Sequence, residues 1–377
     1  MKITVTGTRG IPGIQGGVET HCEELYPRLA SLNYEVFLIR RSCYVSSDNK
    51  IRSYKGVELV DIFTLRKPSI EALLHTFLSV LKARTMGTDI LHIHAIGPAL
   101  LVPMARALGL KVVFTHHGPD YDRAKWGTVA KFMLRLGEKW GTKYANEVIV
   151  ISNVIKDILK NKYRRSNTIL IYNGFTPPVF NYGTDYIKTL GLEPQKYIFC
   201  LGRFVEEKGF DMLIRAFSDL NQNDCRLVIA GDADHETNYS KNLKKTAVQN
   251  KVILTGFIKG ERLQQLFTNA RLFILPSFHE GLPISLLEAM SYRLPVLVSD
   301  IPANKQVNLS DKNYFVTGDE NSLKKGLYEW LKKDFQKADY DMSAYNWDLI
   351  AGKTASVYEK LAGNCKSSDQ SILKETE

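Results

Sequence analysis

The sequence lacks long hydrophobic runs and paired cysteines, and both absences narrow the class of protein. The longest apolar runs, such as FLSVL (77–81) and ALLVPM (99–104), fall far short of the roughly 18 residues that a membrane-spanning helix needs. The N-terminus MKITVTG has no basic region followed by an apolar one, so we expect no signal peptide. The five cysteines are scattered and form no CxxC pair, which argues against a disulfide framework or a zinc finger. These features together favour a reducing compartment, and we expect a cytoplasmic protein.

Acidic residues are outnumbered, and the formal net charge is +10. A basic surface attracts phosphates in general, whether in nucleic acid, anionic lipid headgroups or phosphorylated small molecules. The sequence contains neither a helix-turn-helix pattern nor an aromatic RNA-binding signature, so no nucleic-acid partner is expected. The charge alone does not choose between the lipid and small-molecule classes.

Short β-branched or apolar runs alternate with segments of helical periodicity along all 377 residues. The alternation predicts parallel sheets with helices on both faces, and the length suggests about two domains. A linker is expected at YNGFTPP (172–178), because an Asn-Gly turn and two prolines stop helices and strands. The expected strands are KITVTG, EVFLIR, VELVDI, ILHIHA, KVVFTH and EVIVIS before the linker, and KYIFCLG, CRLVIAG, KVILTG, RLFILP and LPVLVSD after it.

These signals predict two Rossmann-like, doubly wound domains, over 1–176 and 177–345. The run YNWDLIAGKTASVYEKLAG has helical spacing, so we expect a C-terminal helix over 346–364. The polar remainder, 365–377, is expected to be a disordered tail.

The run HEGLPISLLEAM (279–290) holds two carboxylates around an expected helix start. Pro283 suits the first helical position, which puts Glu280 in the preceding loop and Glu288 in the second turn. A helix start binds phosphate through its free N–H groups, and Glu288 would lie roughly 7 Å from that phosphate. The two acids would thus accept hydrogen bonds from hydroxyls on either side of a diphosphate, as in a nucleotide sugar. Taken alone, two glutamates at this spacing are better explained as solvated surface residues.

Two further loops are candidates for binding phosphate. In GRFVEEKG (202–209), Arg203 and Lys208 follow a strand at the edge where ligands bind in open α/β sheets, although an ordinary basic loop would look the same. In TRGIPGIQGGVETH (8–21), Gly16 and Gly17 open a helix and allow close approach of the backbone to a ligand. This glycine spacing is not GxGxxG, and the second strand ends in two arginines rather than an acid, so a nicotinamide dinucleotide site is disfavoured.

The combination of these motifs resembles the retaining glycosyltransferases of family 4, which have the GT-B fold. The resemblance covers nearly the whole chain, and TRGIP…GGVETHCEELYPRL resembles a bacterial subgroup that builds surface polysaccharides. It implies a donor domain over 177–345, an acceptor domain over 1–176, and a C-terminal helix that crosses back to the acceptor domain. For catalysis it implies that Glu280 contacts the transferred sugar and that Arg203 and Lys208 bind the donor diphosphate. The other donor-binding residues that it implies are Gly16, Gly17, Phe257, Ile258, Gly281, Leu282 and Glu288.

Four histidines stand at or near the ends of expected strands. By the same resemblance His117, before Gly118, orients the acceptor or shapes the reaction centre, although the neighbouring His116 leaves this assignment open by one residue. His92 and His94 alternate on one strand and therefore share a face. An HxH pair can bind a metal, but no third and fourth ligand stand at a sensible spacing, so we favour a structural or acceptor-lining role.

The acidic run DAD (232–234) resembles the DxD that binds a divalent metal in the other large glycosyltransferase fold. Here it follows a strand of the second half, where the resembled family has a Gly-Asp turn. We expect these residues to belong to an ordinary loop rather than to a metal site. We expect neither a required metal nor another cofactor.

The segment RAKWGTVAKFMLRLGEKWGTKYA (123–145) has an apolar stripe of Phe132, Leu136 and Trp140 on an expected helix. Its basic stripe consists of Lys131, Arg135, Lys139 and Lys143. Two interpretations remain: contact with an anionic membrane, or an ordinary core-facing helix with a solvated basic side.

The sequence thus predicts a glycosyltransferase that moves a hexosyl unit from a nucleotide-diphosphate sugar to a saccharide or lipid-linked acceptor, with retention, in the synthesis of a cell-surface polysaccharide such as lipopolysaccharide. It would be cytoplasmic, with peripheral contact to the inner face of the membrane. The substrates would lie between the two domains. The alternatives are a nucleotide-sugar epimerase, a phosphorylase with a lysine-bound pyridoxal cofactor, and a non-enzymatic basic scaffold.

Overall fold

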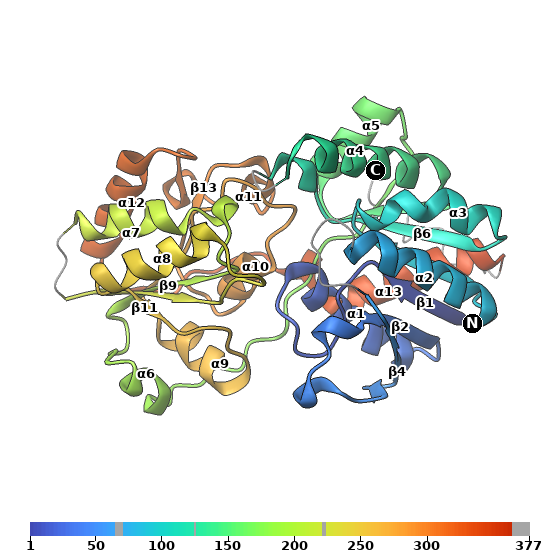
Figure 1. The fold of residues 1–377 in the computed structure, drawn as a ribbon. Coiled ribbons are helices and arrows are strands. Elements are labelled where there is room, and N and C mark those ends of the chain that lie inside the picture. The colour runs from blue at the N-terminus through green and yellow to red at the C-terminus, as the bar shows by residue number, and fades with distance from the viewer. Residues whose placement is uncertain (65–70, 124–125, 221–223, 364–377) are drawn as a thin grey trace. The chain divides into compact units, whose positions relative to one another are not determined.

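The computed structural model describes residues 1–64, 71–123, 126–220 and 224–363, and the chain divides into two compact units. Unit 1 consists of Met1–Gly174 together with the segment that begins at Ala344, and unit 2 is Phe175–Ser343. Each unit contains its own β-sheet covered by helices (Figure 1). The expected tail, 365–377, lies outside the described residues.

Unit 1 is built on an eight-stranded sheet with the order β3-β4-β2-β1-β5-β6-β7-β8. All neighbouring strands are parallel except the pair β3 and β4. The six expected strands are confirmed, whereas β3 and β8 were not predicted because two-residue strands carry no periodicity. The strands are β1 (Lys2–Thr6), β2 (Glu35–Arg41), β3 (Ser53–Tyr54), β4 (Val57–Ile62), β5 (Ile90–His94), β6 (Lys111–His116), β7 (Glu147–Val150) and β8 (Ile169–Leu170).

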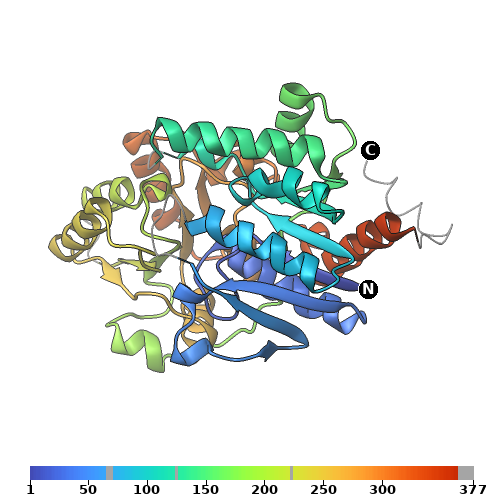
Figure 2. The ribbon, with the colours of Figure 1, turned by 45° about the vertical axis from the view of Figure 1, so that its right-hand side comes forward.

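The helices of unit 1 include one from the C-terminal part of the chain. They are α1 (Gly17–Ser31), α2 (Glu71–Thr85), α3 (Val102–Ala107), α4 (Thr128–Tyr144), α5 (Asn153–Tyr163) and α13 (Trp347–Ala362). Helix α13, red in Figure 2, packs against α1 near the N-terminus of the chain. Its start is fixed by the Asn346 side chain, which accepts hydrogen bonds from the backbone N–H groups of Asp348 and Leu349. Its end is fixed by Gly363 in the left-handed conformation.

Unit 2 repeats the architecture with a six-stranded parallel sheet in the order β11-β10-β9-β12-β13-β14. Its five expected strands are confirmed, and only the two-residue β14 was not predicted. The strands are β9 (Tyr197–Leu201), β10 (Arg226–Ala230), β11 (Ile253–Leu254), β12 (Leu272–Leu275), β13 (Val296–Ser299) and β14 (Tyr314–Phe315). The helices are α6 (Asp185–Thr189), α7 (Phe210–Ser218), α8 (Asn238–Gln249), α9 (Gly260–Asn269), α10 (Ile284–Ser291), α11 (Pro302–Lys305) and α12 (Glu320–Lys332).

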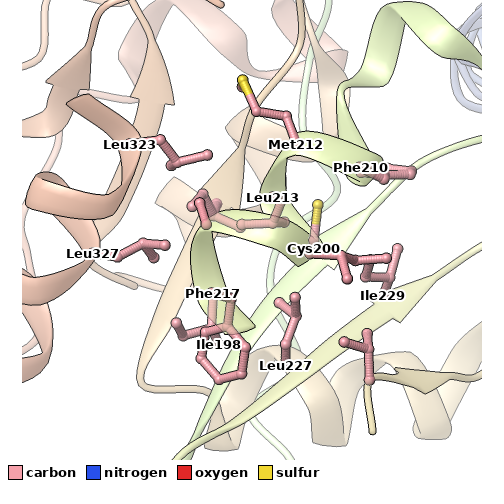
Figure 3. Packing of buried hydrophobic residues seen from close by; sticks show 14 of the residues in the cluster. Ile198, Cys200, Phe210, Met212, Leu213, Phe217, Leu227, Ile229, Leu323 and Leu327 are labelled. Carbon is pink, nitrogen blue, oxygen red and sulfur yellow. The ribbon is translucent and has the colours of Figure 1, made fainter. Parts of the chain in front are cut away.

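One face of the unit 2 sheet is buried under α7 and α12 (Figure 3). Alternate residues of β9 and β10 point into this core, as the period of a strand requires. Each buried leucine of the two helices contributes about 1.5–3 kcal/mol by leaving water. This packing holds β9 and α7 firmly, and the loop between them carries Arg203 and Lys208. The residues labelled in Figure 3 are Ile198, Cys200, Phe210, Met212, Leu213, Phe217, Leu227, Ile229, Leu323 and Leu327.

Within the part of the chain that the structure describes, no helix is both long and apolar enough to cross a bilayer. The four described cysteines, Cys22, Cys43, Cys200 and Cys225, are free thiols.

Candidate functional site

The loop 202–209 of unit 2 is pressed onto the end of a neighbouring strand. It ends at Gly209, whose φ of +65° is a conformation that side chains disfavour. A Cβ at this position would lie 2.4 Å from the carbonyl oxygen of Pro276, directly after β12. The backbone N–H of Phe278 donates to the carbonyl oxygen of Glu207 at 2.8 Å. The loops that follow β9 and β12 are therefore locked together, which brings Lys208 next to Glu280.

Lys208 and Glu280 form an ion pair with 2.5 Å between Nζ and Oε1. Ser277 donates a second hydrogen bond to the same carboxylate oxygen, at 2.6 Å. The two charged side chains are only 15% and 12% exposed. Burial raises the pKa of Glu280, but the charge of Lys208 and the hydrogen bonds from Lys208 and Ser277 outweigh burial and hold that pKa below its usual value. Glu280 is therefore ionised, and the pair is electrically neutral overall.

Arg203 forms a second ion pair in the same loop region. Its Nη1 lies 2.8 Å from Oδ2 of Asp234, and both side chains are mostly buried. Asp232, the other acid of the DAD run, pairs with Lys244 at 2.7 Å and accepts a hydrogen bond from the N–H of Ala233. These contacts are those of a charged loop after β10, as the sequence predicted for this run.

Helix α10 begins one residue later than expected. Pro283 is the N-cap residue with extended backbone angles, and Ile284 is the first helical residue. The prediction that Pro283 occupies the first helical position is thus wrong by one residue, a difference typical of helix ends. Glu280 nevertheless lies in the loop and Glu288 in the second turn, as predicted. Of the other predicted donor residues here, Leu282 is buried, and the carbonyl oxygen of Gly281 accepts a hydrogen bond from Gln306.

The two predicted base-binding residues lie in the turn between β11 and α9. Phe257 is 42% exposed, whereas Ile258 is buried. Phe257 therefore offers an accessible ring face for stacking, and Ile258 fixes the turn to the domain.

In unit 1, the predicted glycine pair starts α1. Gly16 is the N-cap residue and Gly17 the first helical residue. A Cβ on Gly16 would lie 2.0 Å from the carboxylate of Glu19, which in turn accepts hydrogen bonds from Thr8 Oγ1 and from the N–H of Arg9. The glycine is therefore required by the way Glu19 closes the loop, and Gly17 has open space where its side chain would be.

His116 and His117 have different neighbours. His116, the last residue of β6, accepts a hydrogen bond at Nδ1 from the N–H of Gly118 and therefore donates from Nε2 to Glu138, at 3.0 Å. Glu138 also binds Lys162 at 2.6 Å and Tyr163 at 2.6 Å. Burial raises the pKa of Glu138, but its hydrogen bonds with His116, Lys162 and Tyr163 outweigh burial and lower the pKa to about 2. His116 is thus a buried structural partner of Glu138.

His117 joins a cluster of histidines from three elements. His94 ends β5, and its Nδ1 lies 2.8 Å from Nε2 of His117. His21 of α1 packs edge-on against both rings, with centroids 5.5 and 4.9 Å away. Burial lowers the pKa of His21 to about 4 and the pKa values of His94 and His117 well below the usual histidine value. All three imidazoles are therefore neutral at pH 7.

The shared face of His92 and His94 is confirmed by their stacked rings, 4.4 Å apart. No third ligand stood at a sensible sequence spacing from this pair, but the fold brings His21 and His117 to His94, and each places a ring nitrogen within 4.8 Å of a nitrogen of His94. Sequence spacing missed this group, since its members come from separate elements.

Several residues around the cluster were also missed. The Tyr26 hydroxyl contacts both His92 and His94, and Tyr358 of α13 contacts His92 at 2.5 Å. Asn173 binds His21 at 2.9 Å between Oδ1 and Nδ1. No motif marks these residues, and the structure shows Tyr26 on the buried face of α1.

Helix α4 does not bury its apolar stripe as a core-facing helix would. Its buried face consists of Gly137, Glu138, Gly141 and Thr142. A Cβ on Gly137 would lie 2.1 Å from the carbonyl oxygen of Ile96, so the glycines allow close packing on the turn after β5. Phe132 is 63% exposed, and Leu136 and Trp140 are only half-buried. The core-facing interpretation is therefore wrong for Phe132.

Two family models match the chain. The model described as "Glycosyl transferases group 1" matches residues 184–347, and the model "Glycosyltransferase Family 4" matches residues 15–177. The match to the first covers the loops that carry Arg203, Lys208 and Glu280 and the helix that carries Glu288.

Known proteins resemble the chain, some over nearly its whole length and others over a little more than half of it. An uncharacterized glycosyltransferase of Methanocaldococcus jannaschii is 25% identical over 95% of this chain and 98% of its own length. A putative teichuronic acid biosynthesis glycosyltransferase of Bacillus subtilis is 26% identical over 59% of this chain and 56% of its own length.

Solved structures share the fold. The sucrose-phosphate synthase of Thermosynechococcus elongatus has a TM-score of 0.81 at 19% identity, covering 97% of this chain and 100% of that one. The Anabaena protein HepE in complex with UDP-glucose has a TM-score of 0.73 at 17% identity, covering 96% and 98%. Two glycosyltransferase family models match the two halves of the chain, and each unit contains a Rossmann-like sheet. The chain is therefore a glycosyltransferase of the GT-B fold.

Proposed function

We propose that this enzyme moves a hexosyl unit from a nucleotide-diphosphate sugar to a saccharide or lipid-linked acceptor, with retention, in the synthesis of a cell-surface polysaccharide. Unit 2 would bind the donor and unit 1 the acceptor. The observation that carries the proposal is the buried Lys208–Glu280 pair beside the start of α10. The teichuronic acid relative supports the polysaccharide assignment, and the UDP-glucose complex of HepE supports the class of donor.

The chemistry follows from the charges of these loops. A donor diphosphate gains negative charge as the sugar departs, and Arg203, Lys208 and the free N–H groups at the start of α10 would stabilise that charge. Glu280 would accept a hydrogen bond from a sugar hydroxyl while it keeps Lys208 oriented. Glu288 would bind the ribose hydroxyls, Phe257 and Ile258 would contact the base, and the backbone of Gly281 and Leu282 would contact phosphate or sugar. Gly16 and Gly17 of unit 1 would also bind the donor, and His117 would orient the acceptor or shape the reaction centre.

Donor binding is tested first by a thermal-shift screen over UDP-, GDP- and dTDP-sugars, because a ligand that binds only the folded state raises its melting temperature. Arg203→Gln should abolish the shift. Arg215→Gln is the matched control, since Arg215 is half-exposed in α7 and pairs with Asp211 and Glu320. An undiminished shift in Arg203→Gln would remove Arg203 from the donor site.

Transfer is tested with the donor so identified and a mixed saccharide acceptor pool. Glu280→Gln should abolish product formation while the protein stays folded. Retention predicts that the new glycosidic bond has the anomeric configuration of the donor, which NMR of the product reports. A product of opposite configuration would contradict the proposed stereochemistry.

We propose that transfer needs neither a metal ion nor another cofactor. Asp232 and Asp234, the carboxylates that resemble a metal-binding DxD, form ion pairs with Lys244 and Arg203. Excess EDTA should therefore leave the initial rate of transfer unchanged, and a loss that Mg²⁺ or Mn²⁺ restores would contradict this part.

The epimerase alternative would use the same kind of donor site. It would convert the nucleotide sugar without any acceptor, so chromatography of the donor incubated alone separates the two functions. The phosphorylase alternative would require a pyridoxal cofactor, which is visible by its absorbance. The scaffold alternative is set aside, because the chain is a glycosyltransferase.

We further propose a cytoplasmic location with peripheral contact to an anionic membrane through α4. Val129 and Phe132 are 77% and 63% exposed. Arg135 and Lys139 are also exposed and follow Phe132 by about one and two helical turns. Apolar side chains flanked by basic ones suit a bilayer surface that carries negative headgroups. Sedimentation with phosphatidylglycerol vesicles should exceed that with phosphatidylcholine vesicles. Phe132→Ser should abolish the difference, whereas Lys50→Glu, an exposed charge reversal elsewhere in unit 1, should reduce it only slightly.

A further inference from the structure

The histidine cluster of unit 1 has the composition of a metal site. His21, His94 and His117 each offer one ring nitrogen, and these atoms all lie within 4.8 Å of one another. Around a tetrahedral ion with Zn–N bonds of about 2.0–2.1 Å, ligand nitrogens are about 3.3 Å apart. The distance from His94 Nδ1 to His117 Nε2 is already 2.8 Å. Only small ring movements are therefore needed to admit an ion.

Outer hydrogen bonds orient two of the rings. The amide oxygen of Asn173 only accepts, so Nδ1 of His21 carries the proton of that 2.9 Å bond and Nε2 keeps its lone pair. Nε2 of His94 contacts the Tyr26 hydroxyl, which leaves Nδ1 of His94 for the cluster. Histidines that bind metals usually have their other nitrogen held by an oxygen in this way.

The surroundings hold the group in place while leaving one side open. His21 packs against Trp347, with ring centroids 5.4 Å apart, and both His21 and His94 are buried. His117 is half-buried, so an ion and its fourth, water ligand have access from that side.

We propose that His21, His94 and His117 form a binding site for a divalent transition-metal ion of the Zn²⁺ class. An all-imidazole set favours Zn²⁺, Co²⁺, Ni²⁺ or Cu²⁺ over Mg²⁺ and Ca²⁺, which prefer oxygen ligands. Without metal, one proton lies between Nδ1 of His94 and Nε2 of His117. When the ion binds, this proton moves to the other nitrogen of the ring that carries it. Nδ1 of His94 and Nε2 of His117 then both bind the ion. The site shares His117 with the residues proposed above for the acceptor, but its existence does not depend on the proposed transfer reaction, which we expect to need no metal.

The test uses the full chain, stripped of metal with a chelator and then dialysed. Titration with Co²⁺ should give the intense visible bands of a tetrahedral site, saturating at one ion per chain, and Zn²⁺ should displace it. Competition with a chromophoric chelator then measures Zn²⁺ affinity. His117→Gln and His21→Gln should each weaken binding by at least about tenfold, and Asn173→Ala by a similar factor through the orientation of His21.

The control is His235→Gln, a histidine of unit 2 outside the cluster, which should leave the affinity unchanged. Circular dichroism checks that each variant is folded, and using two ligand variants allows for one that does not fold. Failure to bind one ion per chain, or binding that neither ligand variant weakens, would overturn the site and leave a purely hydrogen-bonded cluster. Because the readout is metal binding, that outcome is distinct from any failure of sugar transfer.

Discussion

The Lys208–Glu280 pair makes a quantitative prediction about the stability of unit 2. In Lys208→Met the apolar side chain keeps much of the volume of lysine but removes its charge. Glu280 then stays buried, with 12% of its side chain exposed and one hydrogen bond from Ser277. A buried carboxylate that has lost its cation is strongly destabilising, because its solvation by water is not replaced.

The magnitude follows from the burial of the pair. Breaking a buried ion pair typically costs about 3–5 kcal/mol, and partial exposure here favours the lower end, about 3 kcal/mol. For a domain of this size that loss corresponds to a fall in melting temperature of about 6–12 °C. The double variant Lys208→Met/Glu280→Gln should lose less stability than either single variant, because both charges are removed together. The coupling energy between the two substitutions should be about 2 kcal/mol or more.

Thermal unfolding of the full chain, followed by calorimetry, measures these losses. The control is Lys196→Met, the same substitution in a pair of similar length, 2.6 Å to Glu193, whose side chains are 58% and 68% exposed. We expect no measurable change in that control, because water screens an exposed pair.

The pH dependence gives an independent check. Since pairing lowers the pKa of Glu280 in the wild type, the stability from the pair is present above the ordinary glutamate pKa and is lost as pH falls below it. In Lys208→Met, burial without the cation raises that pKa instead. Between pH 7.5 and 5 the deficit of the variant should therefore shrink. A deficit equal to that of the control, or strictly additive single and double variants, would refute the reasoning.

Three further predictions concern other positions. Gly209→Ala should destabilise unit 2 by about 2–4 kcal/mol in urea unfolding, because its Cβ would meet the Pro276 carbonyl in a left-handed backbone; an unchanged midpoint would contradict that contact. Burial lowers the pKa of His75 to about 3, so protonation favours the unfolded chain as pH falls below 6.5. Between pH 7.5 and 5.5 the free energy of unfolding of the wild type should therefore fall by about 1.4 kcal/mol more than that of His75→Leu. Glu138→Ala should lower the melting temperature of unit 1 by several degrees, because the ammonium of Lys162 and the ring of His116 lose their common acceptor; a shift no larger than for an exposed glutamate such as Glu35 would contradict that role.

Most of the fold was predictable because its elements are long and periodic. Strands such as EVFLIR and KVVFTH are continuous apolar runs, as expected where helices cover both faces of a parallel sheet. The unpredicted strands β3, β8 and β14 have two residues each, so their pairing is decided by neighbouring strands rather than by their own sequence. The start of α10 was misplaced by one residue, since the preference of proline for a helix start does not distinguish the N-cap from the next position.

The candidate site was predictable residue by residue but not as a set of contacts. Lys208 and Glu280 each stood in a recognisable loop, yet nothing in the sequence showed that they meet, because their contact depends on how the loops after β9 and β12 are locked at Gly209. The histidine cluster was missed for a related reason. A spacing of two marked His92 and His94 as a pair, whereas His21 and His117 join His94 through the packing of α1 and the order of β5 and β6 in the sheet.

Unit 1 is assembled from two stretches of chain, with all of unit 2 between them. The second stretch contributes to the core of unit 1. The indole of Trp347 lies so close to Gly174 that a Cβ on this glycine would be 2.6 Å from it. The hydroxyl of Tyr358 contacts His92 of β5. During synthesis, β1 to β8 leave the ribosome first but lack these partners until α13 emerges, on the order of 10 s later at normal elongation rates. The continuous second unit therefore has the chance to fold first. Nascent chains stalled before Trp347 should hold a first unit that lacks α13, and we expect chaperones to recognise the core surface left uncovered.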